Sequence, residues 1–201
     1  MRDVKMISKH NRRTFLIGLA LLGSSVALRG AAKTIAGRSR PAALDRVAAT
    51  TRALTIVPDR WKIIVGHHSG TAVGNAAIFD RYHRSHGMEH GLAYHFVIGN
   101  GSRSGDGEIE IGGRWLKQFA GGHVHDEAVN QVGIGICCVG NFEETQPTPG
   151  QLRSFIALVE YLKADVVKTP VRFAVHREIN PGRTVCPGRN FPIAAMHARF
   201  G

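Results

Sequence analysis

The sequence predicts a single α/β domain in which a central mixed β-sheet is flanked by helices. Short apolar segments rich in β-branched residues alternate along the chain with segments of helical periodicity, and no internal repeat interrupts this alternation. The length of 201 residues suits one domain with appendages. We expect residues 61–201 to form the folded domain. Residues 33–60 have no clear period and are expected to be a mobile linker with one weak helix at most, and residues 1–32 form a separate leader.

Four apolar segments have the length and composition of buried strands. They are residues 62–65, 93–98, 134–139 and 171–175. Acidic and apolar side chains alternate over residues 108–111, which indicates a short edge strand. Residues 115–120 are expected to be a further strand or extended piece. Because helical segments separate the main strands, the sheet should be mixed.

Helical signals are strongest after residue 147. Thr148 is a good N-cap, Pro149 suits the first helical position, and Gln151 stands three residues after the cap. Apolar residues then recur at helical spacing as far as about residue 164. A second helix is expected over residues 76–85.

The first 32 residues resemble a bacterial twin-arginine export signal. Arg12 and Arg13 precede an apolar run from Phe15 to Leu28 that only Gly and Ser interrupt. The run has about 14 residues, whereas a membrane-spanning helix needs about 20. An ordinary basic pair before a short buried helix is the alternative, but the run lacks the polar face of such a helix. We expect export to the periplasm or cell envelope, with only transient membrane contact through the signal.

Most of the net positive charge belongs to the N-terminal part of the chain. Residues 1–60 contain 12 Lys and Arg against 3 Asp and Glu, whereas residues 61–201 contain 14 against 12. A nucleic-acid-binding domain needs a basic surface on its folded part. We therefore expect no nucleic-acid partner.

The three cysteines do not form a disulfide framework. Cys137 and Cys138 lie in the predicted strand 134–139 and are expected to be core thiols. Cys186 follows His176 by ten residues across a Pro-Gly turn, which is typical of half a zinc site. A second histidine could come from the pair His67 and His68, just after strand 62–65. Because this pair lies far upstream of His176, the zinc site would form only in the folded domain. Two histidines and one cysteine leave one tetrahedral position open, which is typical of catalytic zinc.

Five sequence blocks, in order, resemble the zinc-dependent N-acetylmuramoyl-L-alanine amidases of the type 2 family. This family includes amidase-type phage lysozymes and the peptidoglycan recognition proteins. The blocks are residues 67–71, 91–98, 130–136, 140–142 and 176–188, and the resemblance covers residues 62–191. It implies a peptidoglycan hydrolase that cleaves the amide between N-acetylmuramic acid and L-alanine of the stem peptide with zinc-activated water. The implied partner is peptidoglycan or a muropeptide.

By this resemblance Zn²⁺ is bound by His67, His176 and Cys186. The family places its first ligand two positions before a Ser or Thr, which selects His67 over His68. Strand alternation agrees, since neighbouring side chains point to opposite faces and only one can easily face the metal. We expect His68 to be a packing residue or to support a ligand.

The resemblance also implies catalytic roles for Tyr94 and Thr184. Tyr94 matches the family's catalytic tyrosine, although half-buried packing in a strand is its alternative role. Thr184 occupies a position where the family has a lysine or a threonine, and it would act through a hydroxyl hydrogen bond. A simple turn role for Thr184 stays open.

Several other polar residues near these blocks have open roles. His123 and His125 would share a face of an extended segment and are candidates for muropeptide binding. Glu178 could orient a histidine, act as a base or be a surface charge. His95 is expected to be structural. Three more histidines, in and after the predicted helix 76–85, are expected to contact substrate or solvent, and they are His83, His86 and His90.

Two other functions remain possible on the sequence alone. One is a peptidoglycan-binding module without turnover. The other is a structural zinc domain in which a fourth ligand, such as His68 or His125, closes the site. The filled ligand positions together with Tyr94 favour the enzyme.

Overall fold

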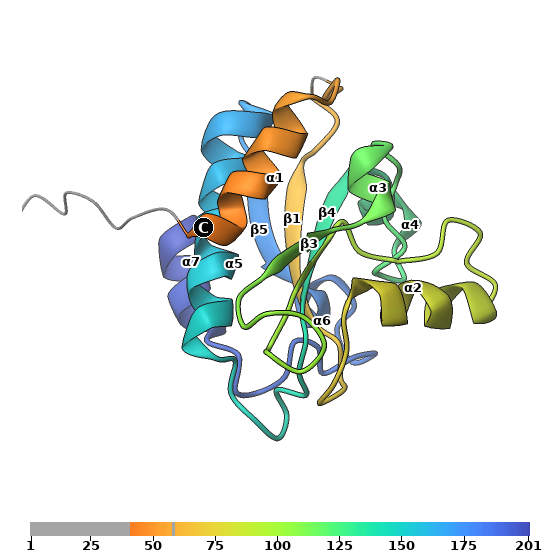
Figure 1. The fold of residues 1–201 in the computed structure, drawn as a ribbon, viewed down its shortest axis with the longest axis vertical. Coiled ribbons are helices and arrows are strands. Elements are labelled where there is room, and N and C mark those ends of the chain that lie inside the picture. The colour runs from red at the N-terminus through yellow and green to blue at the C-terminus, as the bar shows by residue number, and fades with distance from the viewer. Residues whose placement is uncertain (1–40, 58) are drawn as a thin grey trace, which may run out of the picture. The chain divides into compact units, whose positions relative to one another are not determined.

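A computed structural model describes residues 41–57 and 59–201. It contains a five-stranded mixed sheet with the order β3-β2-β4-β1-β5 (Figure 1). Four strands are parallel, and β3 pairs antiparallel with β2 at one edge. The strands are β1 (Ile63–His68), β2 (Phe96–Ile98), β3 (Ile109–Ile111), β4 (Gly133–Cys138) and β5 (Arg172–Val175). This arrangement confirms the predicted α/β class with a central mixed sheet.

One face of the sheet is covered by three helices, which lie together on the left of the sheet in Figure 1. They are α1 (Ala42–Arg52), α5 (Pro149–Tyr161), which continues into the π-helix η1 (Leu162–Val167), and α7 (Ile193–Phe200). Their apolar side chains and alternate residues of the strands form the main hydrophobic core. Burial of this apolar surface is the chief stabilising contribution on this side of the domain.

The predicted start of α5 is confirmed in detail. The Thr148 hydroxyl accepts the Gln151 N–H at 3.0 Å, and the Gln151 side chain accepts the Thr148 N–H at 3.1 Å. This capping box satisfies two backbone donors that a helix start otherwise leaves unpaired. The Gln151 amide also donates to the carbonyls of Ile98 and Val139, at 3.1 and 2.8 Å. The cap therefore ties α5 to the ends of β2 and β4.

Other elements cover the opposite face, which carries the site described below. They are α2 (Ala76–Ser85), α4 (Glu127–Val132) and α6 (His176–Ile179), with a one-turn helix α3 (Gly113–Leu116) between β3 and α4. Two small apolar clusters pack beneath them, one around Phe79 and Val97 and one around Val65 and Ala174. None of the helices among the described residues has the length and apolarity that a membrane span requires.

The structure corrects the predicted boundary between the linker and the folded domain. Within the predicted linker, α1 buries Leu44, Val47 and Ala48 in the main core, and Thr51 accepts a hydrogen bond from the Trp115 indole at 3.0 Å. Residues from 41 onward thus belong to the folded domain. The buried stripe of α1 is hard to detect in the sequence, because two of its members, Ala48 and Thr51, are small or polar.

The prediction of a strand or extended piece over residues 115–120 is wrong at its start, because Trp115 is part of α3 and packs against Phe96. The predicted export signal, residues 1–32, lies outside the described residues.

Candidate metal centre

Three predicted ligands converge at the carboxyl ends of neighbouring parallel strands. His67 lies near the end of β1, His176 is the first residue of α6 directly after β5, and Cys186 lies in the loop between α6 and α7. One side-chain atom from each residue lies within 4.8 Å of the other two. Because β1 and β5 run parallel as neighbours, residues far apart in sequence meet at one edge of the sheet.

The donor atoms of this cluster suit a cation. Cys186 Sγ lies 3.7 Å from His67 Nδ1, and the rings of His67 and His176 are 4.8 Å apart between centroids. His176 Nε2 is buried and has no hydrogen-bond partner among the described residues. A buried polar atom without a partner is costly. Two imidazoles and a thiolate form a ligand set that zinc prefers, with one position left open.

Burial sets the protonation of the three residues. It lowers the pKa of His67 well below the usual value, and nearby His123 and His176 lower it further. Burial also lowers the pKa of His176, so both imidazoles are neutral and offer lone pairs. The pKa of the Cys186 thiol is raised to about 12 by burial, although the backbone N–H of His68 partly opposes this. A metal binds the thiolate, so binding should release a proton from Cys186.

Backbone groups fix the position of Cys186. The His68 N–H donates to Cys186 Sγ at 3.3 Å, and the Arg177 N–H donates to the Cys186 carbonyl at 2.8 Å. The Thr184 hydroxyl accepts the Cys186 N–H at 3.1 Å. Thr184 thus has the turn role that the sequence left open. Its O–H can still act as a donor, so the predicted catalytic role is untested.

His68 lies on the other face of β1, as strand alternation predicts. Its Nδ1 accepts the Phe142 N–H at 3.0 Å, and its ring lies 5.8 Å from the Phe142 ring. This confirms the expectation of a packing role for the side chain. The backbone of His68 also supports the cluster through its bond to Cys186 Sγ.

Tyr94 lies beside the cluster, with its ring centroid 5.2 Å from that of His67. Burial raises the pKa of the Tyr94 hydroxyl well above its usual value, and a hydrogen bond with Cys137 contributes. The hydroxyl therefore keeps its proton at neutral pH. Cys137 and Cys138 are both fully buried free thiols on opposite faces of β4, which confirms their interpretation as core thiols.

The expected pairing of His123 and His125 on one binding surface is wrong. The segment bends instead of extending, so that His123 is buried with 5% exposure and His125 is exposed. His123 Nδ1 lies 3.0 Å from His67 Nε2, and His123 Nε2 lies 3.3 Å from the Gly133 carbonyl oxygen. Burial lowers the pKa of His123 to about 4, so this imidazole is neutral. It belongs to the surroundings of a predicted ligand.

Glu178 acts within the backbone that carries His176. Its carboxylate accepts the Val175 N–H at 2.9 Å, directly before His176, and pairs with His197 Nε2 of α7 at 2.8 Å. Of the roles left open by the sequence, a structural one is therefore favoured. The carboxylate ties the first turn of α6 to α7.

The histidines in and after α2 form no second metal group. Among the residues that the structure describes, the only group with metal-ligand spacing is His67, His176 and Cys186. His83 Nδ1 accepts the Ala93 N–H at 3.2 Å, and the His86 ring lies 4.1 Å from the Tyr82 ring on the exposed side of α2. Both histidines thus have local partners.

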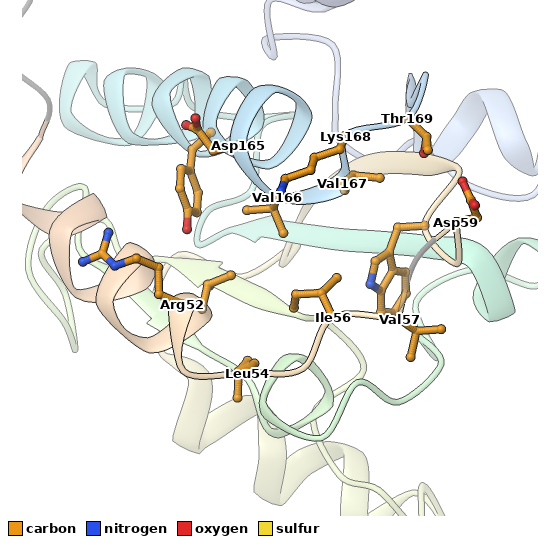
Figure 2. A pocket seen from close by; sticks show the side chains of 13 residues that line it. Arg52, Leu54, Ile56, Val57, Asp59, Asp165, Val166, Val167, Lys168 and Thr169 are labelled. Carbon is orange, nitrogen blue, oxygen red and sulfur yellow. The ribbon is translucent and has the colours of Figure 1, made fainter.

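A separate pocket of about 400 Å³ lies between the segment after α1 and η1. Figure 2 shows Leu54 and Ile56 on one side of it and Val166 and Val167 on the other. None of the predicted site residues lines this pocket. It is therefore distinct from the candidate metal centre.

Comparisons with known proteins identify the family of this fold. A family model described as N-acetylmuramoyl-L-alanine amidase matches residues 57–189. The solved structure of N-acetylmuramoyl-L-alanine amidase LysC from Clostridium intestinale URNW is 32% identical, with a TM-score of 0.58; the match covers 70% of this chain and 85% of LysC. Bumblebee PGRP-SA is 25% identical with a TM-score of 0.53, covering 68% of this chain and 79% of its own.

A more distant structure shows the same fold. Human PGRP-IBETAC, solved in complex with glycosamyl muramyl pentapeptide, is 18% identical with a TM-score of 0.52, and the match covers 71% of this chain and 87% of that one. A comparison with curated proteins finds no match. The family match extends over most of the folded domain and includes all three converging residues, and the chain therefore belongs to the N-acetylmuramoyl-L-alanine amidase family and is a peptidoglycan amidase.

Proposed function

We propose that this amidase is a zinc enzyme in which His67, His176 and Cys186 hold the ion and leave its fourth position open. The proposal rests chiefly on one observation. The three donor atoms lie within 4.8 Å of one another, and His176 Nε2 is buried without a hydrogen-bond partner among the described residues. A cation at this place would satisfy that atom and match the ligand preference of zinc.

The scissile bond is the amide between N-acetylmuramic acid and L-alanine. Zinc bound at the cluster would lower the pKa of a water molecule and polarise the amide carbonyl. Tyr94, whose hydroxyl keeps its proton, would donate a hydrogen bond to the developing oxyanion or a proton to the leaving amine. The position of the Tyr94 ring beside His67 supports this role.

The substrate class follows from the same family. LysC, which is 32% identical, is an N-acetylmuramoyl-L-alanine amidase by name. We infer that this chain acts on peptidoglycan or muropeptides. The Thr184 hydroxyl oxygen accepts the Cys186 N–H, so its own O–H group is still able to donate. Thr184 would assist the reaction by donating this hydrogen bond.

A closed structural zinc site is less well supported. It would need a fourth protein ligand. The His68 ring lies on the other face of β1 and already accepts the Phe142 N–H, and His125 is exposed. Within residues 41–57 and 59–201, the group with ligand spacing contains three residues and no fourth. These observations favour an open position and therefore catalysis.

The decisive experiment measures stem-peptide release. The purified domain is incubated with a defined muropeptide in three arms: as loaded with zinc, after removal of zinc by a chelator, and after zinc is added back. We expect release of free stem peptide, detected by mass spectrometry, in the first and third arms only. Binding of the muropeptide without release by the zinc-loaded domain would instead establish a non-catalytic module.

We also propose that the protein is exported. The support is the sequence of residues 1–32, with Arg12 and Arg13 before a short apolar run. Replacement of both arginines by lysine keeps the charge and should retain the protein in the cytoplasm, as fractionation of cells would detect. Unchanged export of the double variant would contradict the twin-arginine assignment.

A further inference from the structure

We propose that His123 is a positioning residue for the metal, which fixes the tautomer and the ring orientation of His67. This inference rests on the proposed zinc site. It assigns a role to a histidine that lies outside the three proposed ligands and is held by hydrogen bonds and packing.

The direction of the hydrogen bonds follows from one carbonyl group. The Gly133 oxygen can only accept, so His123 Nε2, at 3.3 Å, must carry the hydrogen. In a neutral imidazole the other nitrogen is then an acceptor, and His123 Nδ1 must receive a hydrogen from His67 Nε2 at 3.0 Å. His67 Nδ1 is thereby left with its lone pair.

That lone pair faces the proposed site. His67 Nδ1 is the ring nitrogen 3.7 Å from Cys186 Sγ. The opposite tautomer would place a hydrogen on Nδ1 and remove the lone pair from the zinc position. It would also leave His67 Nε2 and His123 Nδ1 facing each other as two acceptors. The Gly133 carbonyl thus selects, through His123, the tautomer that can bind metal.

The protein makes room for the His123 ring with two glycines, Gly121 and Gly135. A Cβ atom at Gly121 would lie 2.5 Å from His123 Cδ2, and one at Gly135 would lie 2.4 Å from the same atom. At Gly133 it would lie 3.5 Å from His123 Cε1 and 2.6 Å from the Val129 carbonyl oxygen. Gly121 and Gly135 therefore leave a space on the site face that the imidazole fills, whereas the absence of a side chain at Gly133 avoids a clash with the Val129 carbonyl oxygen.

The backbone around His123 is also fixed. Asn130 Oδ1 accepts the N–H groups of His123 and Val124, at 3.0 and 3.2 Å, and Asn130 Nδ2 donates to the Val124 carbonyl at 2.9 Å. Asn130 is itself buried in α4. The ring is thus held from its backbone, from its Nε2 atom and by the glycines around it. Such a constraint suits a residue that orients another side chain.

The test compares zinc affinity in two His123 variants. His123→Ala removes the acceptor for His67 Nε2, and loss of such a partner typically weakens metal binding about 10- to 100-fold. His123→Asn keeps a side-chain oxygen near the place of Nδ1, so it should recover affinity to within about threefold of the original protein. Competition with a chromogenic chelator measures both affinities without reference to activity.

The matched control is Thr51→Val. It removes a buried hydrogen bond, from the Trp115 indole, in the core on the opposite face. It should lower stability without changing zinc affinity. Equal zinc affinity of His123→Ala and the original protein would overturn the inference. Failure of the original protein to bind zinc would instead overturn the proposed function.

A second measurement covers the case in which His123→Ala does not fold. Long-range ¹H–¹⁵N spectra of the zinc-loaded original protein report the tautomer of each histidine. We expect His67 to carry its hydrogen on Nε2 and His123 to carry its own on Nε2. A hydrogen on His67 Nδ1, or on His123 Nδ1, would overturn the inference whatever the variants do.

Discussion

The two faces of the sheet have different contents although the same strands supply both. Toward α1, α5 and α7 the strands present apolar side chains to a continuous hydrophobic core. Toward α2, α4 and α6 they present His67, Cys137 and the glycines of β4, with small apolar clusters beside them. One face thus stabilises the domain by burial, whereas the other holds polar groups that need defined partners.

Neighbouring residues of β1 illustrate the difference. His67 and His68 are both buried, with 0% and 8% exposure. His68 accepts a backbone N–H of Phe142, whereas His67 lies between Cys186 Sγ and His123. The residue type is the same, and the face of the strand decides the role. Substitutions on the core face should therefore lower the stability of the fold, and substitutions on the site face should lower metal affinity and turnover.

The largest expected effect is that of Cys186→Ser. It replaces the thiolate by a hydroxyl that binds zinc poorly, so zinc should be lost and stem-peptide release should fall at least about 1000-fold. Metal content and release by mass spectrometry measure the effect. Cys138→Ala is the control, because Cys138 lies on the core face and should keep full zinc content. Full activity of Cys186→Ser would show that the ligand assignment is wrong.

On the core face, Leu158→Ala should act on stability alone. Leu158 is fully buried in the main core, and such a truncation costs about 3 kcal/mol of the free energy of unfolding. Urea denaturation measures the loss. Zinc affinity of the folded protein should not change. A matching drop in zinc affinity would break the proposed separation of the two faces.

Tyr94→Phe should separate chemistry from metal binding on the site face. It removes the hydroxyl but keeps the ring beside His67, so zinc stays bound while turnover falls about 100-fold. Steady-state kinetics with a muropeptide and zinc content are measured together. An unchanged rate would remove Tyr94 from the mechanism and leave it the packing role.

Acid should weaken the metal-free domain through its buried histidines, of which His95 is one. Burial lowers the pKa of His95 well below its usual value of 6.5, and the proximity of His123, Arg114 and Arg60 lowers it further, although a hydrogen bond to the Phe119 carbonyl opposes this. Below a pH of about 6.5, the His95 imidazole of the unfolded chain binds a proton, whereas that of the folded chain stays neutral. The free energy of unfolding therefore falls as the pH falls, by up to about 1.4 kcal/mol per pH unit. Above that pH the effect vanishes.

Denaturant unfolding between pH 7.5 and 5, in the presence of a zinc chelator, measures this slope. In His95→Asn the side-chain oxygen can still accept the Gly135 N–H that His95 Nδ1 accepts at 3.0 Å. The slope of this variant should be smaller than that of the original protein. Equal slopes would mean that His95 does not contribute to acid sensitivity.

The smallest effect is expected for Thr184→Val. It removes the acceptor of the Cys186 N–H, one hydrogen bond worth about 1 kcal/mol, so zinc affinity and turnover should fall less than about tenfold. Thr184→Ser keeps the hydroxyl and should behave like the original protein. A loss of turnover near 100-fold with zinc affinity intact would instead support direct action of the hydroxyl on the substrate.

Local sequence was sufficient for the main strands and for the start of α5, whereas the choice of His67 over His68 also needed the family resemblance. The capping residues of α5, the apolar strands and the alternation of β1 all depend on neighbours within a few positions. A weak helix was allowed within residues 33–60, but its place in the domain was not predicted, because its short buried stripe of Leu44, Val47 and Ala48 does not show that it packs against the main core. Helix propensity alone is a weak predictor of the position of such a segment.

The fold class, the family and the residue types of the candidate metal centre follow from the sequence pattern. The surroundings of that centre depend on the tertiary structure: the approach of His123 to His67 across 56 positions of the chain, the bond from the His68 N–H to Cys186 Sγ, and the turn role of Thr184. The physical reason is that hydrogen-bond partners brought together by strand order leave no periodic signal in the sequence. Gly121 and Gly135 border the His123 ring, but a glycine in the sequence does not indicate which side chain fills the space beside it.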